Sequence, residues 1–106
     1  MTKKTTEAAI LAHAKRLSKQ LGLATLRVTL RQGAEVGWPD LIVLGPNRGA
    51  LFMETKAPGK DATPIQKERA RVICQYGHAY CKPDSKEAVE KALVSFAEYC
   101  LALGEK

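Results

Sequence analysis

The chain has 106 residues, of which 17 are lysine or arginine and 11 are aspartate or glutamate, so its formal net charge is +6. This length fits one domain over residues 1–106 with a core of its own, and the positive charge favours a polyanionic partner. Three cysteines without a C-x-x-C pair argue against a disulfide framework and a zinc site. The N-terminal segment does not resemble a secretory signal, and no run approaches the ~18 apolar residues of a membrane span. We therefore expect a cytoplasmic protein without a membrane partner.

The first predicted element is an amphipathic helix over residues 5–21, with Gly22 as its natural C-terminal stop. Its apolar residues recur at helical spacing: Ile10, Ala14, Leu17 and Leu21. Glu7 falls on the same stripe, three residues before Ile10. It is either a first-turn acid favoured by the helix dipole or a carboxylate that the helix carries toward a functional site.

A half-buried strand is predicted next, because Leu26, Val28 and Leu30 alternate with polar residues. Arg27 and Arg31 share the polar face of this strand. They either contact a nucleic-acid backbone or keep an edge strand soluble.

The segment from Gly37 to Lys56 organises the chain. Two short apolar runs, 41–44 and 50–53, flank the turn-forming segment 45–49, which predicts an antiparallel hairpin. Asp40 precedes Asn47 by seven residues and Glu54 follows it by seven, so a symmetric hairpin places their Cβ atoms about 5 Å apart. Lys56 lies two residues beyond Glu54 and points to the same face. The open end of the hairpin therefore collects two carboxylates and an ammonium group.

Two carboxylates this close repel each other by about 3 kcal/mol at an effective dielectric constant of about 20. Lys56 offsets part of this repulsion, and a divalent cation offsets it better. Mg²⁺ prefers carboxylate oxygens, needs only one or two of them and keeps several waters. Taken singly, the residues are also explained as a turn-capping Asp and an exposed Glu–Lys pair. Their mirrored spacing favours a metal site.

A second helix is predicted to begin after the loop 57–62, because Thr63, Pro64 and Gln66 form a capping box. Its predicted apolar stripe consists of Ile65, Val72, Ile73 and Tyr76. Gln66 has an adequate structural role as the cap partner. This loop and helix form the densest basic region of the chain, with Lys60, Lys67, Arg69 and Arg71.

A short strand at 78–81 and a last helix, capped by Asp84 or Ser85, complete the chain. The predicted order is helix, three strands, helix, strand, helix. The strand–helix–strand unit from Met53 to Cys81 implies a parallel crossover. The expected fold class is α/β, with a small mixed β-sheet flanked by helices.

The residues at the open end of the hairpin, Pro39-Asp40 and then Glu54-Thr55-Lys56, resemble the PD-(D/E)xK nuclease signature. The extended series is more specific: residues 37–42, 54–57 and 63–66, followed by Gly77, closely resemble the virus-type replication-repair nuclease (VRR-Nuc) domain. Thr63 stands where that family often has serine. The resemblance spans roughly residues 7–93, nearly the whole chain.

This resemblance implies a restriction-endonuclease-like core and a metal-dependent endonuclease that hydrolyses DNA. The family's substrates are often branched, such as Holliday junctions or flaps. Asp40, Glu54 and the Thr55 carbonyl would bind Mg²⁺ or Mn²⁺, and Lys56 would orient the attacking water and stabilise developing negative charge. Glu7 matches an N-terminal helix acid that some members contribute, and Gln66 matches a glutamine after the site; both are catalytic candidates, and Glu7 is also a candidate metal ligand.

The resemblance also implies DNA repair, a phage or prophage setting and, for stand-alone members of this size, a homodimer. Basic side chains around the site are the candidate DNA contacts: Arg27, Arg31, Arg48, Lys60, Lys67 and Arg71. The main alternative is a non-catalytic nucleic-acid-binding module on the same fold. A sequence-specific restriction enzyme is a further alternative, but the chain has no visible recognition domain.

Overall fold

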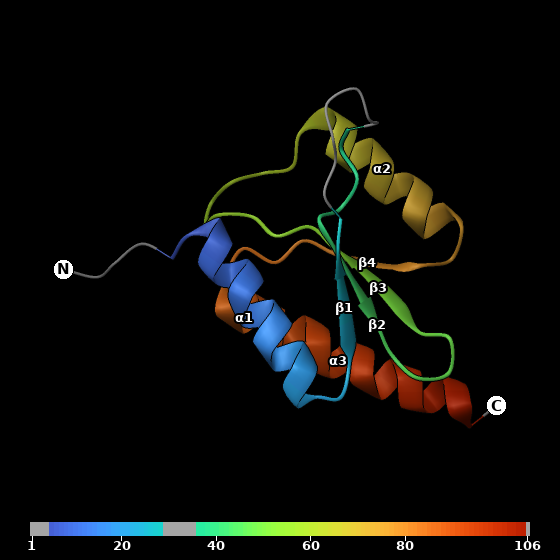
Figure 1. The fold of residues 1–106 in the computed structure, drawn as a ribbon. Helices are drawn as coiled ribbons and strands as arrows, with labels where there is room; N and C mark the ends of the chain where they lie inside the picture. Colours follow the sequence, from blue (N-terminus) through green and yellow to red (C-terminus); the bar gives the residue numbers. More distant parts are fainter. Residues whose placement is uncertain (1–4, 29–35, 106) are drawn as a thin grey trace.

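The computed structural model describes residues 5–28 and 36–105. Its elements are α1 (Glu7–Gln20), β1 (Ala24–Arg27), β2 (Leu41–Leu44), β3 (Ala50–Met53), α2 (Pro64–Gln75), β4 (Ala79–Cys81) and α3 (Lys86–Gly104) (Figure 1). The order of helices and strands is the predicted one, and the fold is a mixed α/β fold.

The strands form one four-stranded sheet in the order β1-β2-β3-β4. β1 and β2 pair antiparallel, as do β2 and β3, whereas β3 and β4 pair in parallel. The helix α2 therefore lies in the crossover between two parallel strands, as the sequence predicts. The hairpin that carries the candidate acids occupies the centre of the sheet.

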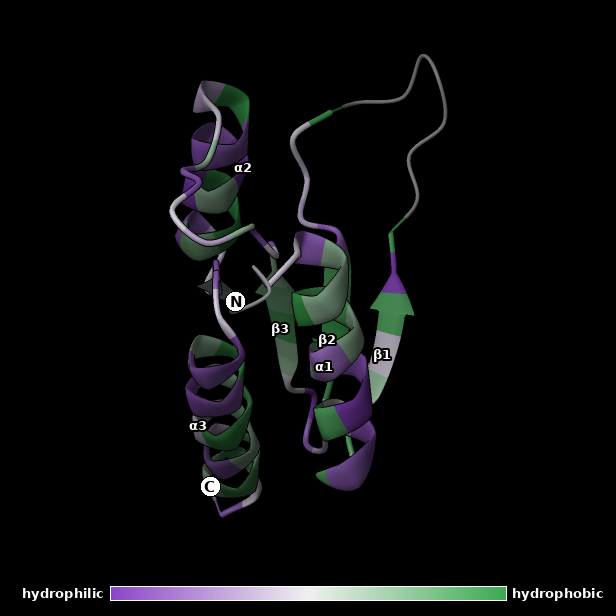
Figure 2. Cartoon of the chain, turned by 90° about the vertical axis from the view of Figure 1, so that its left-hand side faces the viewer, coloured by the Kyte–Doolittle hydropathy of each residue, from purple (hydrophilic) through white to green (hydrophobic). Residues whose placement is uncertain are grey.

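The helices α1 and α3 cover one face of the sheet, while α2 lies beyond the end of this pair (Figures 1 and 2). Side chains from both helices and from the inner face of the sheet form one core: Ile10, Leu11, Ala14, Leu23, Leu41, Val43, Leu51, Met53, Val89, Leu93, Phe96 and Cys100. This core fixes the position of the hairpin between its two neighbouring strands. No helix in the described ranges is long and apolar enough to cross a membrane.

Threonine or serine side chains cap the N-termini of the three helices in the described residues. Thr6 Oγ1 accepts a hydrogen bond from the Ala9 N–H (3.1 Å). At α3, Ser85 rather than Asp84 is the cap, and its Oγ accepts from the Ala88 N–H (3.0 Å). Both satisfy backbone donors that the first turn of a helix leaves unpaired.

The face assignment predicted for the first strand is wrong. β1 begins at Ala24 and ends at Arg27, and Leu26 is 55% exposed on the outer face. Arg27 pairs in register with the fully buried Leu41, so it lies on the side of the sheet that faces the helices. The buried residue is Leu23, directly before the strand. Alternation from Leu23 places Thr25 and Arg27, rather than Leu26, on the side of the sheet that faces the helices.

The apolar stripe predicted for α2 is only partly correct. Ile73 is buried, but Ile65 is 39% and Tyr76 is 73% exposed. The helix contacts the sheet at β4 and lies beyond the end of the main core, so only a narrow face of it is covered. Its position relative to the hairpin therefore depends on other contacts, which lie at the candidate site.

Candidate active site

The β2–β3 register brings Asp40 and Glu54 together at the open end of the hairpin. Leu41 pairs with Met53, so the next pair outward is Asp40 and Glu54. The Asp40 N–H donates a hydrogen bond to Glu54 Oε2 (3.2 Å). This is the mirrored pairing that the sequence predicts.

The tight turn at the other end of the hairpin fixes this register. Asn47 and Arg48 have φ values of 60° and 68°, and the Gly49 N–H donates to the Pro46 carbonyl (3.2 Å). Two central residues with positive φ match the right-handed twist of paired strands. The Asn47 side-chain amide also donates to the Cys100 carbonyl of α3 (2.9 Å), which ties the turn to the last helix.

Asp40 is held by the chain segment that follows β3. Its Oδ1 accepts from the Thr55 N–H (3.2 Å) and its Oδ2 accepts from the Thr55 hydroxyl (2.8 Å). Thr55 is fully buried. These two bonds fix the orientation of the Asp40 carboxylate before any ligand binds.

Glu54 is almost completely buried, with 6% of the residue exposed. Besides the Asp40 N–H, it accepts a hydrogen bond through Oε1 from Gln66 Nε2 (2.5 Å). The Lys56 ammonium lies 4.0 Å from the same Oε1. Three chain segments thus meet at one carboxylate.

This environment raises the pKa of Glu54 from its ordinary 4.5 to about 7. Burial is the largest cause, since it penalises the charged form, and the negative charge of Asp40 adds to it. Lys56 and the Asp40 N–H act in the opposite direction, and Glu7 makes the smallest contribution to the rise. A carboxyl group perturbed in this way by burial and a second acid is typical of a functional site.

Gln66 takes part in the capping box of α2 and also contacts Glu54. Its Oε1 accepts from the Thr63 N–H (2.9 Å) while Thr63 Oγ1 accepts from the Gln66 N–H (3.3 Å), which completes the predicted capping box. The other end of the same amide donates to Glu54. The cap of α2 and the position of Glu54 are therefore connected through one side chain.

The segment leading into Asp40 is attached to the same helix. The Arg69 guanidinium stacks 4.6 Å from the centre of the Trp38 ring, and its Nε donates to the Val36 carbonyl (3.1 Å). Gly37 has a φ of 89°, and a Cβ there would lie 2.8 Å from a side-chain carbon of Ile65. Sequence reasoning treated Arg69 only as part of a basic region. Its position three residues after Gln66, on the same helix face, is the signal that could have identified it.

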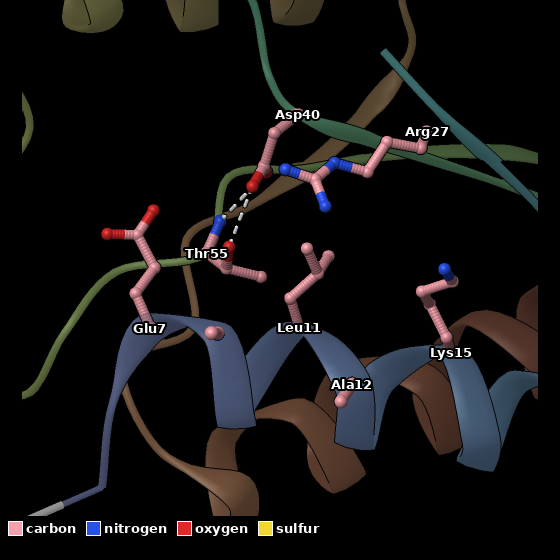
Figure 3. A pocket seen from close by; sticks show the side chains of 8 residues that line it. Glu7, Leu11, Ala12, Lys15, Arg27, Asp40 and Thr55 are labelled. Carbon is pink, nitrogen blue, oxygen red and sulfur yellow. Dashed lines mark hydrogen bonds between the residues drawn. The ribbon is translucent and has the colours of Figure 1, made fainter. Parts of the chain in front are cut away.

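A cleft of about 400 Å³ opens between α1 and the site. Its lining residues are Glu7, Ala8, Leu11, Ala12, Lys15, Arg27, Asp40 and Thr55. Figure 3 shows Glu7 and Asp40 at one end and Lys15 at the other, with Arg27 reaching from the sheet toward Asp40. The structure therefore brings Glu7 to the predicted site, on the first turn of α1.

The remaining basic residues predicted to contact DNA are dispersed. Arg48 lies in the turn at the opposite end of the hairpin, and Arg31 lies outside the described residues. Lys60 is exposed in the loop before α2. Lys67 pairs with Asp61 (3.1 Å), and Arg71 pairs with Glu68 (2.6 Å). The basic region at α2 is therefore partly neutralised by its own acids.

The donor set fits a hard divalent cation. Within residues 5–28 and 36–105, no three or more His, Cys, Asp or Glu side chains gather into a metal-binding cluster. Mg²⁺ needs only one or two carboxylates and fills its other positions with water, so Asp40, Glu54 and the Thr55 backbone carbonyl provide enough oxygen ligands. A cation beside these acids would also offset the repulsion that raises the pKa of Glu54.

Comparison with known proteins points to one kind of domain. No protein-family model matches the sequence. A phage protein, "Putative nuclease p44" of Acyrthosiphon pisum secondary endosymbiont phage 1, is 42% identical over 52 residues, which are 48% of this chain and 55% of that protein. The chain thus matches about half the length of this relative.

Two solved structures have the same fold. One, described as a "VRR_NUC domain", has a TM-score of 0.73 and 25% identity over 82% of this chain and 92% of its own length. The other, described as a "VRR_NUC domain protein", has a TM-score of 0.72 and 23% identity over 91% of each chain.

Proposed function

We propose that this chain, which belongs to the VRR-Nuc family of the PD-(D/E)xK nuclease superfamily, is an endonuclease that hydrolyses phosphodiester bonds of DNA with the help of Mg²⁺ or Mn²⁺. One observation carries the proposal. Asp40 and Glu54 are held side by side by the strand register, in a buried environment that raises the pKa of Glu54 to about 7. A fold gains no stability from such a pair, whereas a cation-binding site requires it.

The cation would be held by the carboxylates of Asp40 and Glu54 and by the Thr55 carbonyl, with Glu7 as a further candidate ligand. A divalent cation supplies positive charge that offsets the charge on the phosphate and lowers the pKa of a bound water. Asp40 needs no rearrangement for this role, because Thr55 already fixes its carboxylate. Pre-organisation of this kind is what a reactive site requires.

Lys56 is the proposed partner of the attacking water and of the transition state. Its ammonium lies 4.0 Å from Glu54 and is only 13% exposed, so its charge is poorly screened by solvent. Negative charge accumulates on the phosphate oxygens during in-line attack, and a fixed cation there stabilises it. Gln66 acts on this centre indirectly, by holding the Glu54 carboxylate in place.

DNA is the proposed substrate, and branched DNA such as a flap or four-way junction is the proposed preference. The formal charge of +6 favours a polyanion, and contacts to the phosphate backbone carry no sequence information. Recognition by shape is therefore favoured over recognition by sequence. A homodimer, in which two sites face two strands of one junction, is proposed together with this preference.

A cleavage panel tests the function directly. The full chain is incubated with linear, flap, fork and four-way DNA in Mg²⁺, Mn²⁺ or excess chelator, and its mass is measured in solution. We expect cleavage of the branched substrates only with metal. Asp40→Asn keeps an acceptor for Thr55 but removes the charge, and it should lower the rate at least about 100-fold, as should Lys56→Ala.

Matched controls separate chemistry from folding. Lys91→Ala and Glu98→Ala change the same charges on the exposed surface of α3 and should cleave like the unmodified chain. Circular dichroism checks that each variant is folded. Cleavage that survives chelation, or full activity of both site variants, would overturn the proposal. Metal-independent DNA binding without cleavage of any substrate would instead support the non-catalytic binding module.

A further inference from the structure

The cleft beside the acids has a second, basic end that the chemistry of the acids does not use. Glu7, Leu11 and Lys15 follow one another at intervals of four residues on α1, so they lie on one face of the helix. Glu7 stands at the acidic end and Lys15 at the basic end, about 12 Å apart along the helix axis. Arg27 reaches the same cleft from β1, and its guanidinium extends toward Asp40, between the two ends (Figure 3).

Packing within the fold does not explain the position of Arg27. Its partners across the sheet, Leu41 and then Met53, are both fully buried in the core. Residues paired across the sheet in this way share one face, so an apolar residue is expected next to Leu41. The chain has an arginine at this position instead. Within the described parts of the chain, neither Arg27 nor Lys15 has an ion-pair partner. Two cations from different elements therefore line one cleft with no acid paired to either of them.

We infer that Lys15 and Arg27 form a second phosphate subsite, which binds a phosphate of the cleaved strand within two nucleotides of the scissile one. This inference rests on the proposed function, because it places the scissile phosphate at Asp40 and Glu54. An arginine fork fits phosphate oxygens with two parallel hydrogen bonds, and a lysine adds a mobile point charge. The subsite gives the charged groups of the cleft different roles: the acids cut the strand, and Lys15 and Arg27 hold it.

The dimensions of the cleft suit one strand. Its volume of about 400 Å³ lies at the small end of the range for ligand pockets, about 300–1,000 Å³. This volume suits a small ligand, so the cleft takes a short stretch of one strand rather than both strands of a duplex. Between the charged ends its floor consists of Ala8, Leu11 and Ala12, which are short enough to let a sugar or base approach. These side chains cannot distinguish bases by hydrogen bonding, which agrees with binding that is independent of sequence.

The test neutralises one phosphate at a time. The branched substrate that is cleaved best is synthesised with a single uncharged methylphosphonate linkage at each position within three of the cut. With the unmodified chain, one such linkage beside the cut should lower kcat/KM about tenfold, mainly by raising KM. With the double variant Lys15→Ala/Arg27→Ala, the all-phosphate substrate should already be cleaved about tenfold less efficiently, and the same linkage should then have less than about a twofold effect.

The control is Arg16→Ala, which removes the same charge from the neighbouring exposed position of α1, outside the cleft. It should remain as sensitive to the neutral linkage as the unmodified chain. Equal sensitivity of the double variant and the unmodified chain at every position would overturn the subsite while leaving the nuclease proposal intact. DNA binding in chelator gives an independent measurement, because the double variant should have a slope of log K against log salt that is smaller by about 1 to 2. If no substrate is cleaved at all, the proposed function fails, and an unchanged salt slope would then overturn the subsite separately.

Discussion

Replacing Glu54 with glutamine should stabilise the metal-free protein at pH 8, although it removes a proposed metal ligand. Burial and the neighbouring Asp40 raise the pKa of Glu54 from 4.5 to about 7. One pKa unit corresponds to about 1.4 kcal/mol, so keeping this side chain ionised in the folded state costs up to about 3 kcal/mol. Glutamine has nearly the same shape and cannot ionise, so the variant avoids that cost. Its amide nitrogen cannot accept one of the two hydrogen bonds that the carboxylate accepts from the Asp40 N–H and from Gln66, which offsets about 1 kcal/mol of the gain.

The sign of the pH dependence follows from the two pKa values. The unfolded chain releases the Glu54 proton near pH 4.5, but the folded chain releases it only near pH 7. Between these values the folded state binds more protons than the unfolded state, so its stability falls as the pH rises. Below pH 4.5 the two states are equally protonated, and above pH 7 the full cost is present. The advantage of Glu54→Gln should therefore grow from less than about 1 kcal/mol at pH 5 to about 2 kcal/mol at pH 8.

Urea unfolding in excess chelator, followed by circular dichroism at pH 5, 6, 7 and 8, measures this difference. Glu98→Gln makes the same chemical change at an exposed position of α3 and should stay within about 0.5 kcal/mol of the unmodified chain throughout. Saturating Mg²⁺ should reverse the order, because it stabilises only the chain that binds it. If the advantage of Glu54→Gln were the same at pH 5 and pH 8, burial of a charge at this site could not be its cause.

Two further predictions concern the same site. The affinity for Mg²⁺ should rise by up to about tenfold per pH unit between pH 5 and 7 and then level off, because the cation displaces the Glu54 proton. Calorimetry in buffers of different ionisation enthalpy would detect the released proton. An Mg²⁺ affinity that does not change with pH would contradict this release. Gly37→Ala should lose about 1 to 3 kcal/mol of stability and most of its cleavage rate, since its φ of 89° disfavours a side chain and its Cβ would meet Ile65 at 2.8 Å. Gly59→Ala is the control for backbone strain alone, because Gly59 has a φ of 77° and a Cβ there would have no atom within 4 Å. Equal losses of stability and rate in both variants would exclude the contact with Ile65 as the cause.

The central hairpin follows from the sequence because local rules determine it. The turn residues fix where the chain reverses, and the spacing of seven residues on either side of Asn47 then decides which side chains face each other. The pairing of Leu41 with Met53 beside the two acids agrees with that reasoning. The capping box at Thr63 and the parallel pairing of β3 with β4 are likewise consequences of short-range chemistry and chain connectivity.

The features that the sequence does not reveal depend on contacts between distant segments. Alternation alone cannot decide which face of β1 is buried, because the end of α1 inserts Leu23 into the core and thereby fixes the register. Because Leu23 and Arg27 lie on the same face of this strand, the burial of Leu23 also places Arg27 toward the cleft. In the same way, the sequence predicts Lys67 and Arg71 as available DNA contacts, whereas in the structure each forms an ion pair, with Asp61 and Glu68 respectively.

The two contacts of Gln66 give a final prediction. It compares loss of the α2 cap, which lies next to the site, with loss of the α3 cap, which does not contact Glu54. Thr63→Ala removes the acceptor for the Gln66 N–H and should cost about 1 kcal/mol of stability. Loosening this first turn should also loosen the Gln66 side chain, which accepts from the Thr63 N–H and holds Glu54. We therefore expect a lower kcat per folded molecule, whereas Thr63→Ser should retain both properties. Ser85→Ala removes the equivalent cap of α3. Within the described residues Ser85 makes no hydrogen bond to Glu54, so this variant should lose similar stability at unchanged kcat. Equal kcat values for Thr63→Ala and Ser85→Ala, measured at a temperature where both are folded, would mean that the cap does not position the acid.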